Sequence, residues 1–377
     1  MSKVNVIKFL DKYLGRLICL ILSFFRIFYS KKEIEINKIL IIQLWGIGES
    51  ILTLPAISGL RKKFPKANID ILLTDRNKDV YYNNKDINKQ ISLKLNPFSI
   101  KLFILKNFRK YDLVIDMEEY LNISSIISFF IGKKRIGFFH NIRSKLYTDT
   151  IKFNDHQHNS QTFADLLKPI KLNYKVKNLI KLNYSQKDKK FINNLLKNKI
   201  NKNDFIVGIA PGAAESARSR MWPLKNYIQL SNELIKKYKN IKIIFIGNNK
   251  EKCLIEDIIK KINEKSKIIN FAGKTTLRQL FYLTEKLNLM VSNDAGAMHI
   301  AAAQSTKTIG LFGPNLPIRF GPLNNKSFSI YKGEICKYSP CINVHKGQVP
   351  ECFYQEKDYQ KCMKNIKVED VLKLVKF

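Results

Sequence analysis

The chain has 377 residues, of which 45% are hydrophobic and 26% are charged; this composition excludes a disordered protein, and the length favours two compact domains. The 66 Lys and Arg residues outnumber the 31 Asp and Glu residues, which leaves a net charge of +35 and indicates an anionic partner. The lysines are scattered through every segment, so a compositional bias contributes to this charge, which we therefore discount as a functional signal.

The N-terminal segment 1–36 is amphipathic. Its apolar stretch 17–25 follows Arg16 and ends at Arg26, so it falls short of the roughly 20 apolar residues that a membrane span needs. No small-residue cleavage site follows, which argues against a secretory signal. Two interpretations remain open: a helix lying in the interface of an anionic membrane, and a helix packed on the protein's own surface. Lysines flank the stretch at Lys8, Lys12, Lys31 and Lys32.

From residue 38 onward, short apolar runs alternate with amphipathic stretches, which is typical of βα units in parallel sheets. The first unit is a strand at 39–42, a glycine turn at 46–50 and a helix that runs to residue 64. We expect a first domain over residues 37–185. Its further strands are predicted at 69–73, 112–116 and 135–138, the last closing the sheet.

The polar region 155–203 is poor in strands and includes a helical run around Phe191, so we place the domain junction there. A second domain over residues 200–377 then repeats the alternation. Two doubly wound α/β domains are expected to bind ligands at the carboxyl ends of their strands. The strands of the second half are predicted at 205–210, 241–246, 287–291 and 307–312.

Two turns of the second half suit an anionic ligand. In the segment 292–299 a strand ends near Ser292 and a helix begins near Gly296, so free backbone N–H groups would offer a diphosphate site. His299 falls in the first turn of that helix and could donate to a phosphate oxygen. From the residues alone, a structural role for Asp294 and His299 is at least as plausible as a ligand contact.

The second turn, at 210–214, is followed by two arginines and by a helix that starts after Trp222 and Pro223. An arginine can bind phosphate through its guanidinium fork. The alternative for Arg218 and Arg220 is a solvated loop pair.

Four of the six cysteines gather near the C-terminus. Their spacings match no paired zinc-ligand pattern, and nothing else suggests export. We expect reduced structural thiols and no metal, with a metal or a disulfide as the open alternatives. The four are Cys336, Cys341, Cys352 and Cys362.

Three motifs, in order along residues 38 to 365, together resemble the signature of glycosyltransferase family 9, the heptosyltransferase family. The C-terminal cysteines, ending in Cys362-Met363, are also similar to those of some members. The motifs are Gly46–Ser50 with Leu54–Ala56, then Pro211–Ala213 with Arg220–Pro223, and last Asn293–His299 with Leu311–Pro314.

The resemblance implies a GT-B fold, that is, two doubly wound Rossmann-like domains facing a central cleft. It also implies an inverting transfer, typically from ADP-heptose to a lipopolysaccharide core sugar, with no essential metal and no cofactor. Glu49 stands where the family has its general base, usually an aspartate, and Arg220 stands where a lysine commonly contacts the donor diphosphate. A carboxylate complementing the helix dipole is the alternative for Glu49. Ala295 replaces a residue that is often hydroxylated, which leaves backbone N–H groups as donors.

The expected site therefore has Glu49 as the catalytic group, with Glu251 and Asn249 as candidates for contact with the donor ribose. The expected partners are a nucleotide-sugar donor, an anionic glycolipid acceptor and an anionic membrane, with no nucleic acid. The expected location is the inner face of the bacterial inner membrane, on the cytoplasmic side. Alternatives are a GT-B nucleotide-sugar epimerase and a non-catalytic anion- or nucleic-acid-binding protein. The expected donor-binding residues are Gly212, Ser216, Arg220, Asp294, Ala295, Gly296 and His299.

Overall fold

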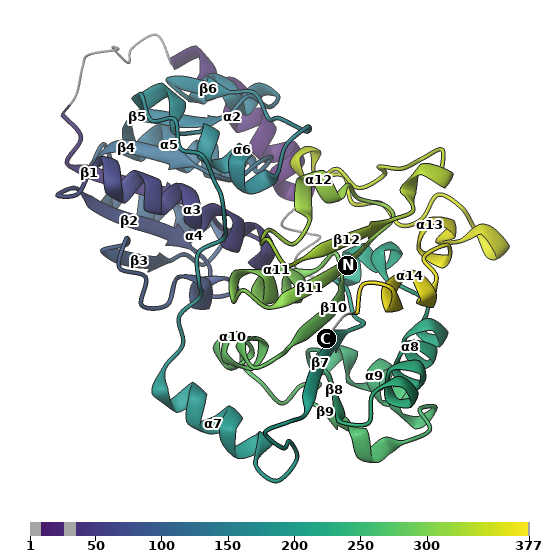
Figure 1. Cartoon of the computed structure of the whole chain (residues 1–377). Coiled ribbons are helices and arrows are strands. Elements are labelled where there is room, and N and C mark those ends of the chain that lie inside the picture. Colours follow the sequence, from purple (N-terminus) through teal and green to yellow (C-terminus); the bar gives the residue numbers. More distant parts are fainter. Residues whose placement is uncertain (1–8, 26–34, 376–377) are drawn as a thin grey trace. The chain divides into compact units, whose positions relative to one another are not determined.

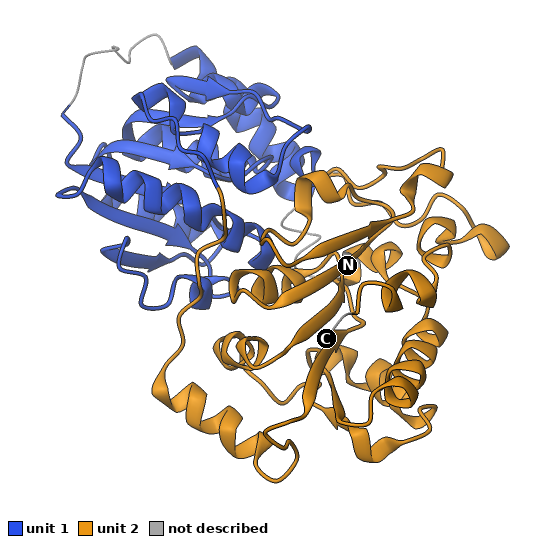
Figure 2. Cartoon of the chain, viewed as in Figure 1, with its two compact units in different colours: residues 1–176, 344–347 blue, residues 177–343, 348–377 orange. Residues whose placement is uncertain are grey.

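The computed structural model describes residues 9–25 and 35–375 (Figure 1). The chain divides into two compact units, residues 1–176 with 344–347 and residues 177–343 with 348–377 (Figure 2). The sequence-based prediction extends the first domain to residue 185, whereas residues 177–185 belong to unit 2. Contacts within unit 2 hold this segment: Lys181 pairs with Glu285 at 2.9 Å, and the Leu182 N–H donates to Gln304 Oε1 at 3.2 Å.

Unit 1 contains a six-stranded parallel sheet in the order β3-β2-β1-β4-β5-β6. The predicted strands at 39–42, 69–73 and 112–116 are confirmed, because their apolar runs are buried on both faces of the sheet. The prediction that 135–138 closes the sheet is wrong: β6 pairs beyond it, and this strand is too short and polar to give an apolar run. The strands are β1 (Lys38–Ile42), β2 (Asn68–Leu73), β3 (Lys89–Ser92), β4 (Tyr111–Asp116), β5 (Gly132–Phe138) and β6 (Asp149–Ile151).

The helices of unit 1 fall into two groups by their contacts. α3 packs against α6, while α5 contacts both α2 and α4. α2 continues the π-helical turn η1, and Figure 1 shows it as the purple helix. The helical segments are η1 (Asp11–Gly15), α2 (Arg16–Phe24), α3 (Ile47–Lys63), η3 (Lys78–Tyr81), α4 (Pro97–Lys106), α5 (Asn122–Ile131), η4 (Ile142–Leu146), α6 (Asn159–Asp165), η5 (Lys168–Ile170) and η10 (Val344–Lys346).

Unit 2 contains a second six-stranded parallel sheet, in the order β12-β11-β10-β7-β8-β9. All four predicted strands are present, although β10 ends two residues later than expected. β9 and β12 lie at the two edges and were not predicted. The strands are β7 (Phe205–Ala210), β8 (Ile241–Phe245), β9 (Ile268–Asn270), β10 (Leu289–Asn293), β11 (Lys307–Phe312) and β12 (Phe328–Tyr331).

The helices of unit 2 pack on this sheet through apolar stripes, and Trp222, Tyr227 and Leu230 enter the larger hydrophobic cluster. The helix starts predicted after Pro223 and at Gly296 are confirmed. The helical segments are α7 (Gln186–Leu196), η6 (Glu215–Arg220), α8 (Leu224–Lys237), η7 (Asn249–Glu251), α9 (Lys252–Lys260), η8 (Lys265–Lys267), α10 (Leu277–Glu285), α11 (Gly296–Ala303), α12 (Pro317–Phe320), η9 (Gly333–Ile335), η11 (Glu356–Asp358), α13 (Lys361–Lys364) and α14 (Val368–Leu372).

Strand order reverses direction once in each sheet. In unit 1 the reversal lies between β1 and β4, and in unit 2 it lies between β7 and β10. Open parallel sheets bind ligands outside the carboxyl ends of the strands at such a switch point. The loops after these four strands therefore carry most of the candidate site residues, while Asn249 and Glu251 follow β8.

Candidate active site

The turn after β1 positions Glu49 in the first turn of α3. Gly46 precedes the helix with φ +64°, a conformation that favours glycine. A Cβ atom at Gly46 would lie 1.8 Å from Glu49 Oε2, so the glutamate side chain folds back over the glycine. The Ser50 N–H and hydroxyl both donate to the Gly46 carbonyl, at 3.1 and 2.7 Å. Ser50 thus holds the turn through the Gly46 carbonyl. The half-buried carboxylate of Glu49 lies against the backbone of the same turn.

A buried carboxyl group from the neighbouring strand fixes the start of this turn. Glu118 follows β4, and its Oε1 accepts from the backbone N–H groups of Leu44 at 2.5 Å and Trp45 at 2.8 Å. Gln43 Nε2 donates to the same oxygen at 3.1 Å. Burial raises the pKa of Glu118 to about 8, and the negative charge of Asp116 adds to the rise. Glu118 is a structural clamp that was not predicted from the sequence.

The next residue, Glu119, places a second carboxyl group near Glu49. It is buried, and its Oε1 accepts from Asn159 Nδ2 at 2.8 Å, while its Oε2 has no hydrogen-bond partner among the described residues. Burial raises the pKa of Glu119 to about 8; the hydrogen bond from Asn159 opposes this rise, and the charge of Glu49 adds to it. The loop after β4 therefore brings two buried carboxyl groups with raised pKa values, Glu118 and Glu119, close to the turn that carries Glu49.

A buried ion pair supports the loop that carries Glu118 and Glu119. Arg143 Nη2 lies 2.9 Å from Asp116 Oδ2, and neither side chain is exposed to solvent. Arg143 Nη1 donates to the backbone carbonyls of Glu118 and Glu119, at 2.8 and 2.9 Å. The Tyr147 hydroxyl donates to the same Asp116 oxygen at 2.5 Å. The pair is hydrogen-bonded on several sides, as a buried charge requires, and it fixes the backbone of Glu118 and Glu119.

In unit 2, Asn293 joins the ends of β10 and β7. Its Nδ2 donates to the carbonyls of Pro211 and Gly212, at 2.9 and 3.1 Å. Its Oδ1 accepts from the Trp222 N–H at 3.1 Å and from the Tyr227 hydroxyl at 2.8 Å. One buried amide therefore holds together the two turns that the sequence analysis singled out.

Arg220 and Asp294 form a partly buried pair at the end of β10. Arg220 Nη1 lies 3.4 Å from Asp294 Oδ2 and donates to the Asp294 carbonyl at 3.2 Å, while Arg220 Nε has no partner among the described residues. Asn315 Nδ2 donates to the same carboxylate oxygen at 2.8 Å. Arg220 is thus anchored on one side and keeps donor capacity on the other. The neighbouring Arg218 is exposed, in keeping with the solvated alternative.

The start of α11 lies next to this pair in the sequence. Ala295 is its N-cap residue, in extended conformation, and its side chain accepts no hydrogen bond. The N-terminus of a helix attracts anions through its unpaired N–H groups and its dipole. His299 is buried at 3% exposure, one turn further along the helix. Gly296 is the first helical residue, so the backbone N–H groups of the first turn begin where the sequence predicted them.

The remaining predicted donor residues lie at the ends of β7 and β8. A Cβ atom at Gly212 would lie 2.0 Å from Glu251 Oε1, so this carboxylate packs on the turn after β7. Glu251 Oε2 also accepts from the Asn248 N–H at 2.7 Å. Asn249 is exposed, and its side chain packs against Gly273. Ser216 lies in η6, and its side chain falls outside the described part of the structure.

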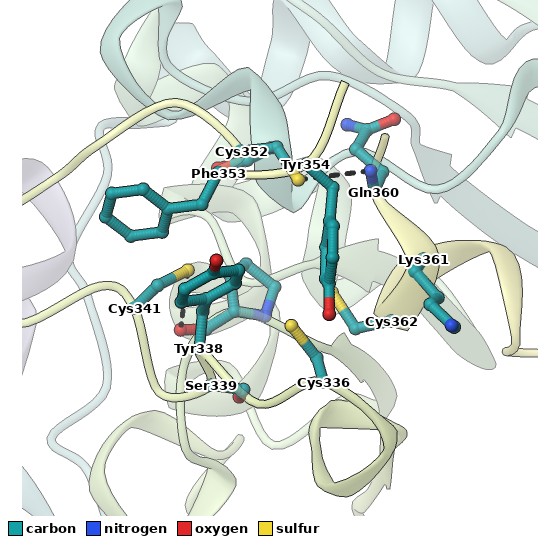
Figure 3. Close-up of a pocket in the computed structure, with 12 residues that line it drawn as sticks. Cys336, Tyr338, Ser339, Cys341, Cys352, Phe353, Tyr354, Gln360, Lys361 and Cys362 are labelled. Atoms are coloured by element: carbon teal, nitrogen blue, oxygen red, sulfur yellow. Dashed lines mark hydrogen bonds between the residues drawn. The ribbon is translucent and has the colours of Figure 1, made fainter. Parts of the chain in front are cut away.

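The four C-terminal cysteines line one pocket together with aromatic side chains (Figure 3). All four are free thiols. Burial raises the pKa of Cys341 to about 11 and that of Cys362 to about 12. Among the described residues, no group of three or more His, Cys, Asp or Glu side chains is arranged to hold a metal ion. The pocket belongs to the loop-rich end of unit 2, and the predicted donor residues do not line it.

Comparison with known proteins is consistent with this geometry. The sequence profile of glycosyltransferase family 9 (heptosyltransferase) matches residues 105–346, more than half of the chain. The lipooligosaccharide heptosyltransferase 2 of Haemophilus ducreyi is 26% identical over 347 residues, covering 84% of this chain and 94% of that relative.

Two solved structures share the fold. The family 9 glycosyltransferase from Veillonella parvula has a TM-score of 0.75 at 18% identity and covers 92% of this chain and 98% of that one. The E. coli ADP-heptose lipopolysaccharide heptosyltransferase II has a TM-score of 0.70 at 20% identity, with coverage of 89% and 97%.

Proposed function

The chain belongs to glycosyltransferase family 9, the heptosyltransferase family, and we propose that it transfers heptose from ADP-heptose to a lipopolysaccharide core with inversion at the anomeric carbon. It is a glycosyltransferase, and its two parallel sheets with flanking helices have the GT-B fold. The observation that carries the proposal is the Arg220–Asp294 pair beside the N-terminus of α11, at the switch point of the unit 2 sheet.

Unit 2 is the proposed donor half-site. The diphosphate of the donor would accept from the first-turn N–H groups of α11 and from the guanidinium group of Arg220, which Asp294 holds beside them. Glu251 is the proposed ribose ligand, because its carboxylate lies on the turn after β7. The ADP-heptose assignment is supported by the E. coli structural neighbour, which is an ADP-heptose enzyme by name.

Unit 1 is the proposed acceptor half-site, with Glu49 as the general base. The oxygen of the acceptor hydroxyl attacks the anomeric carbon and its proton passes to the Glu49 carboxylate, while the bond between that carbon and the phosphate oxygen breaks on the opposite face. The electron pair of the broken bond stays on the diphosphate. Arg220 and the helix N-terminus stabilise this charge as it develops. No hydrogen bond among the described residues engages the Glu49 carboxylate, which leaves it available for this role.

We place the enzyme on the cytoplasmic side of the inner membrane, in peripheral contact with it, because the proposed acceptor is a membrane-anchored glycolipid. The outward apolar side chains of the N-terminal helix support this contact. Among the described residues, no helix has both the length and the apolar character to cross a bilayer.

The test is transfer by the purified protein with ADP-heptose and a lipopolysaccharide core acceptor, read as ADP release and as acceptor mass. We expect Glu49→Gln to abolish turnover while ADP-heptose still raises Tm, because the donor residues lie in unit 2. A survey with ADP-, UDP- and GDP-sugars tests the nucleotide. If Glu49→Gln turned over like the wild type, Glu49 would not be the base; if no nucleotide sugar raised Tm, the protein would not bind such a donor.

A further inference from the structure

Two helices of unit 1 expose apolar side chains on either side of α5. Along η1 and α2, the outward residues follow a helical spacing and form one stripe, while Cys19 and its neighbours pack inward against α5. The second set lies on α4 and just after it. The stripe consists of Leu10, Tyr13, Leu14, Leu17, Ile21 and Phe24, and the second set consists of Phe98, Leu102, Leu105 and Phe108.

The exposure is large for side chains of this kind. Leu17 is 53% exposed and Phe24 69%, while Phe98 is 76% exposed and Leu105 64%. Scattered single apolar residues on a surface need no explanation, but ten on two segments whose helices both contact α5 indicate an interaction surface. The inward side chains of both helices already pack in the hydrophobic clusters of unit 1, so packing within the unit does not account for the exposed apolar side chains.

Both helices lie against α5, so their exposed faces belong to one side of the unit. α5 contacts α2 and α4, and its residues Ile123 and Phe130 pack in the clusters beneath both helices. Asp11 anchors the N-terminal helix there: its carboxylate accepts from the N–H groups of Asn122 and Ile123, at 2.9 and 2.7 Å. The helix that carries the stripe is therefore packed against unit 1 and hydrogen-bonded to α5.

The exposed charged residues of these two segments are all cationic. Segment 97–110 contains no Asp or Glu, and its Lys101, Lys106 and Lys110 are exposed. In segment 9–25 the only acidic residue is Asp11, which is turned toward α5, while Lys12 and Arg16 are exposed. Apolar side chains bordered by cations fit the boundary between acyl chains and anionic headgroups. A second copy of the same face would bring like charges together.

We propose that α2 and α4 together form a docking face for an anionic lipid bilayer, which both helices contact while lying parallel to it. The proposal extends the membrane contact of the N-terminal helix to α4, and it rests on the proposed function in that the acceptor is a glycolipid. The bilayer would bring the acceptor to unit 1, where Glu49 lies.

The test is cosedimentation of the full chain with phosphatidylcholine vesicles that contain or lack phosphatidylglycerol. We expect binding to the anionic vesicles and little to the neutral ones, with binding weakened by salt. Leu105→Ser on α4 and Ile21→Ser on α2 should each reduce vesicle binding by about tenfold, because each removes an inserted side chain. Ile318→Ser on α12 of unit 2 is the matched control, since Ile318 is 53% exposed and Ile21 is 51% exposed.

Several outcomes would overturn the proposal. If Leu105→Ser bound vesicles like the wild type, α4 would not be part of the docking face. An equal loss of vesicle binding with Ile318→Ser would show that the effect is not specific to this face. Equal binding to neutral vesicles would exclude the anionic headgroup. A concentration-dependent dimer that Ile21→Ser dissociates would show that a second copy covers the face.

A separate assay distinguishes this proposal from the proposed function. Heptose transfer to a water-soluble core oligosaccharide without acyl chains needs no membrane, so Leu105→Ser and Ile21→Ser should keep wild-type rates with that acceptor. Loss of transfer with the soluble acceptor in both variants would mean that the helices support the fold of unit 1, which would overturn the docking assignment. Absence of transfer by the wild type would count against the proposed function alone.

Discussion

Replacing Gly46 with alanine tests whether the turn after β1 exists to position Glu49. The glycine has φ +64° and ψ 122°, a combination that a residue with a Cβ atom rarely adopts. The new methyl group would also lie 1.8 Å from Glu49 Oε2 and 2.6 Å from its Cδ. Gly46→Ala therefore strains the backbone and expels the carboxylate from its place at the same time.

The two effects have different magnitudes and different readouts. Backbone strain of this type costs about 1–3 kcal/mol, and in a domain of this size each kcal/mol lowers Tm by about 2–4 °C. A displaced general base costs about 10²–10⁴-fold in rate. The donor half-site in unit 2 contains neither residue, so the KM for ADP-heptose should change little. We therefore expect a modest fall in Tm, a fall in kcat of at least about a hundredfold and unchanged donor affinity.

A double-mutant cycle separates strain from displacement. In a Glu49→Ala background the carboxylate is already absent, so Gly46→Ala should lower Tm again but should not lower kcat further. The assay is initial-rate ADP release with saturating acceptor, together with thermal unfolding of all four proteins. Wild-type kcat in Gly46→Ala, or kcat losses that multiply in the double variant, would refute the coupling between the glycine and the base.

Three further predictions concern the charged and polar residues. Arg220→Met should raise the KM for ADP-heptose about tenfold or more because a diphosphate ligand is lost, whereas Arg218→Met, its exposed neighbour, should not; equal effects in steady-state kinetics would contradict the assignment. The folded-state pKa of Glu119, about 8, exceeds its ordinary value of 4.5, so its contribution to stability is greatest below pH 4.5 and falls as pH rises to about 8. Because the pKa of Glu118 is also raised to about 8, Glu119→Gln should reduce the slope of Tm against pH in this range without removing it, and an unchanged slope would exclude Glu119 as a contributor. Asn293→Ala should destabilise unit 2 by about 3 kcal/mol in urea unfolding, since its amide makes four hydrogen bonds; a loss below about 1 kcal/mol would show that water replaces them.

The central strands of both sheets could be predicted from the sequence because they are buried on both faces and read as continuous apolar runs. Ile39–Ile42 and Phe205–Ala210 are of this kind. The edge strands could not be predicted in the same way. β3 begins with Lys89 and Gln90, and β6 is the tripeptide Asp149–Ile151, so neither carries an apolar run. Edge strands are half-solvated and short, and their pairing comes from the sheet beside them.

The site was predictable where a turn carries its own signal and was missed where it depends on pairing between distant residues. A glycine-containing turn after an apolar strand pointed to the segment around Asp294, whereas Glu49 was indicated only by the resemblance to the family. Nothing near Glu118 in the sequence indicates that its carboxylate holds the turn 74 residues before it. The Asp116–Arg143 pair likewise spans 27 residues. Such contacts follow from the strand order, which places β4 beside β1 only once the sheet is assembled.

This chain departs from the family pattern at positions 49 and 295, and in each place the surrounding residues bear on the change. Glutamate at position 49 is one methylene longer than the usual aspartate, and Gly46, which lacks a Cβ atom, leaves the space into which the longer side chain folds back. At position 295 alanine offers no hydroxyl group, but the carboxylate of Asp294 holds Arg220 and accepts from Asn315, so a cation stands beside the bare helix N-terminus. We propose that in both places backbone geometry and a neighbouring residue compensate for the missing or displaced side-chain atom. The residue type alone is therefore a poor guide to loss of function at these positions, and the contacts around it decide.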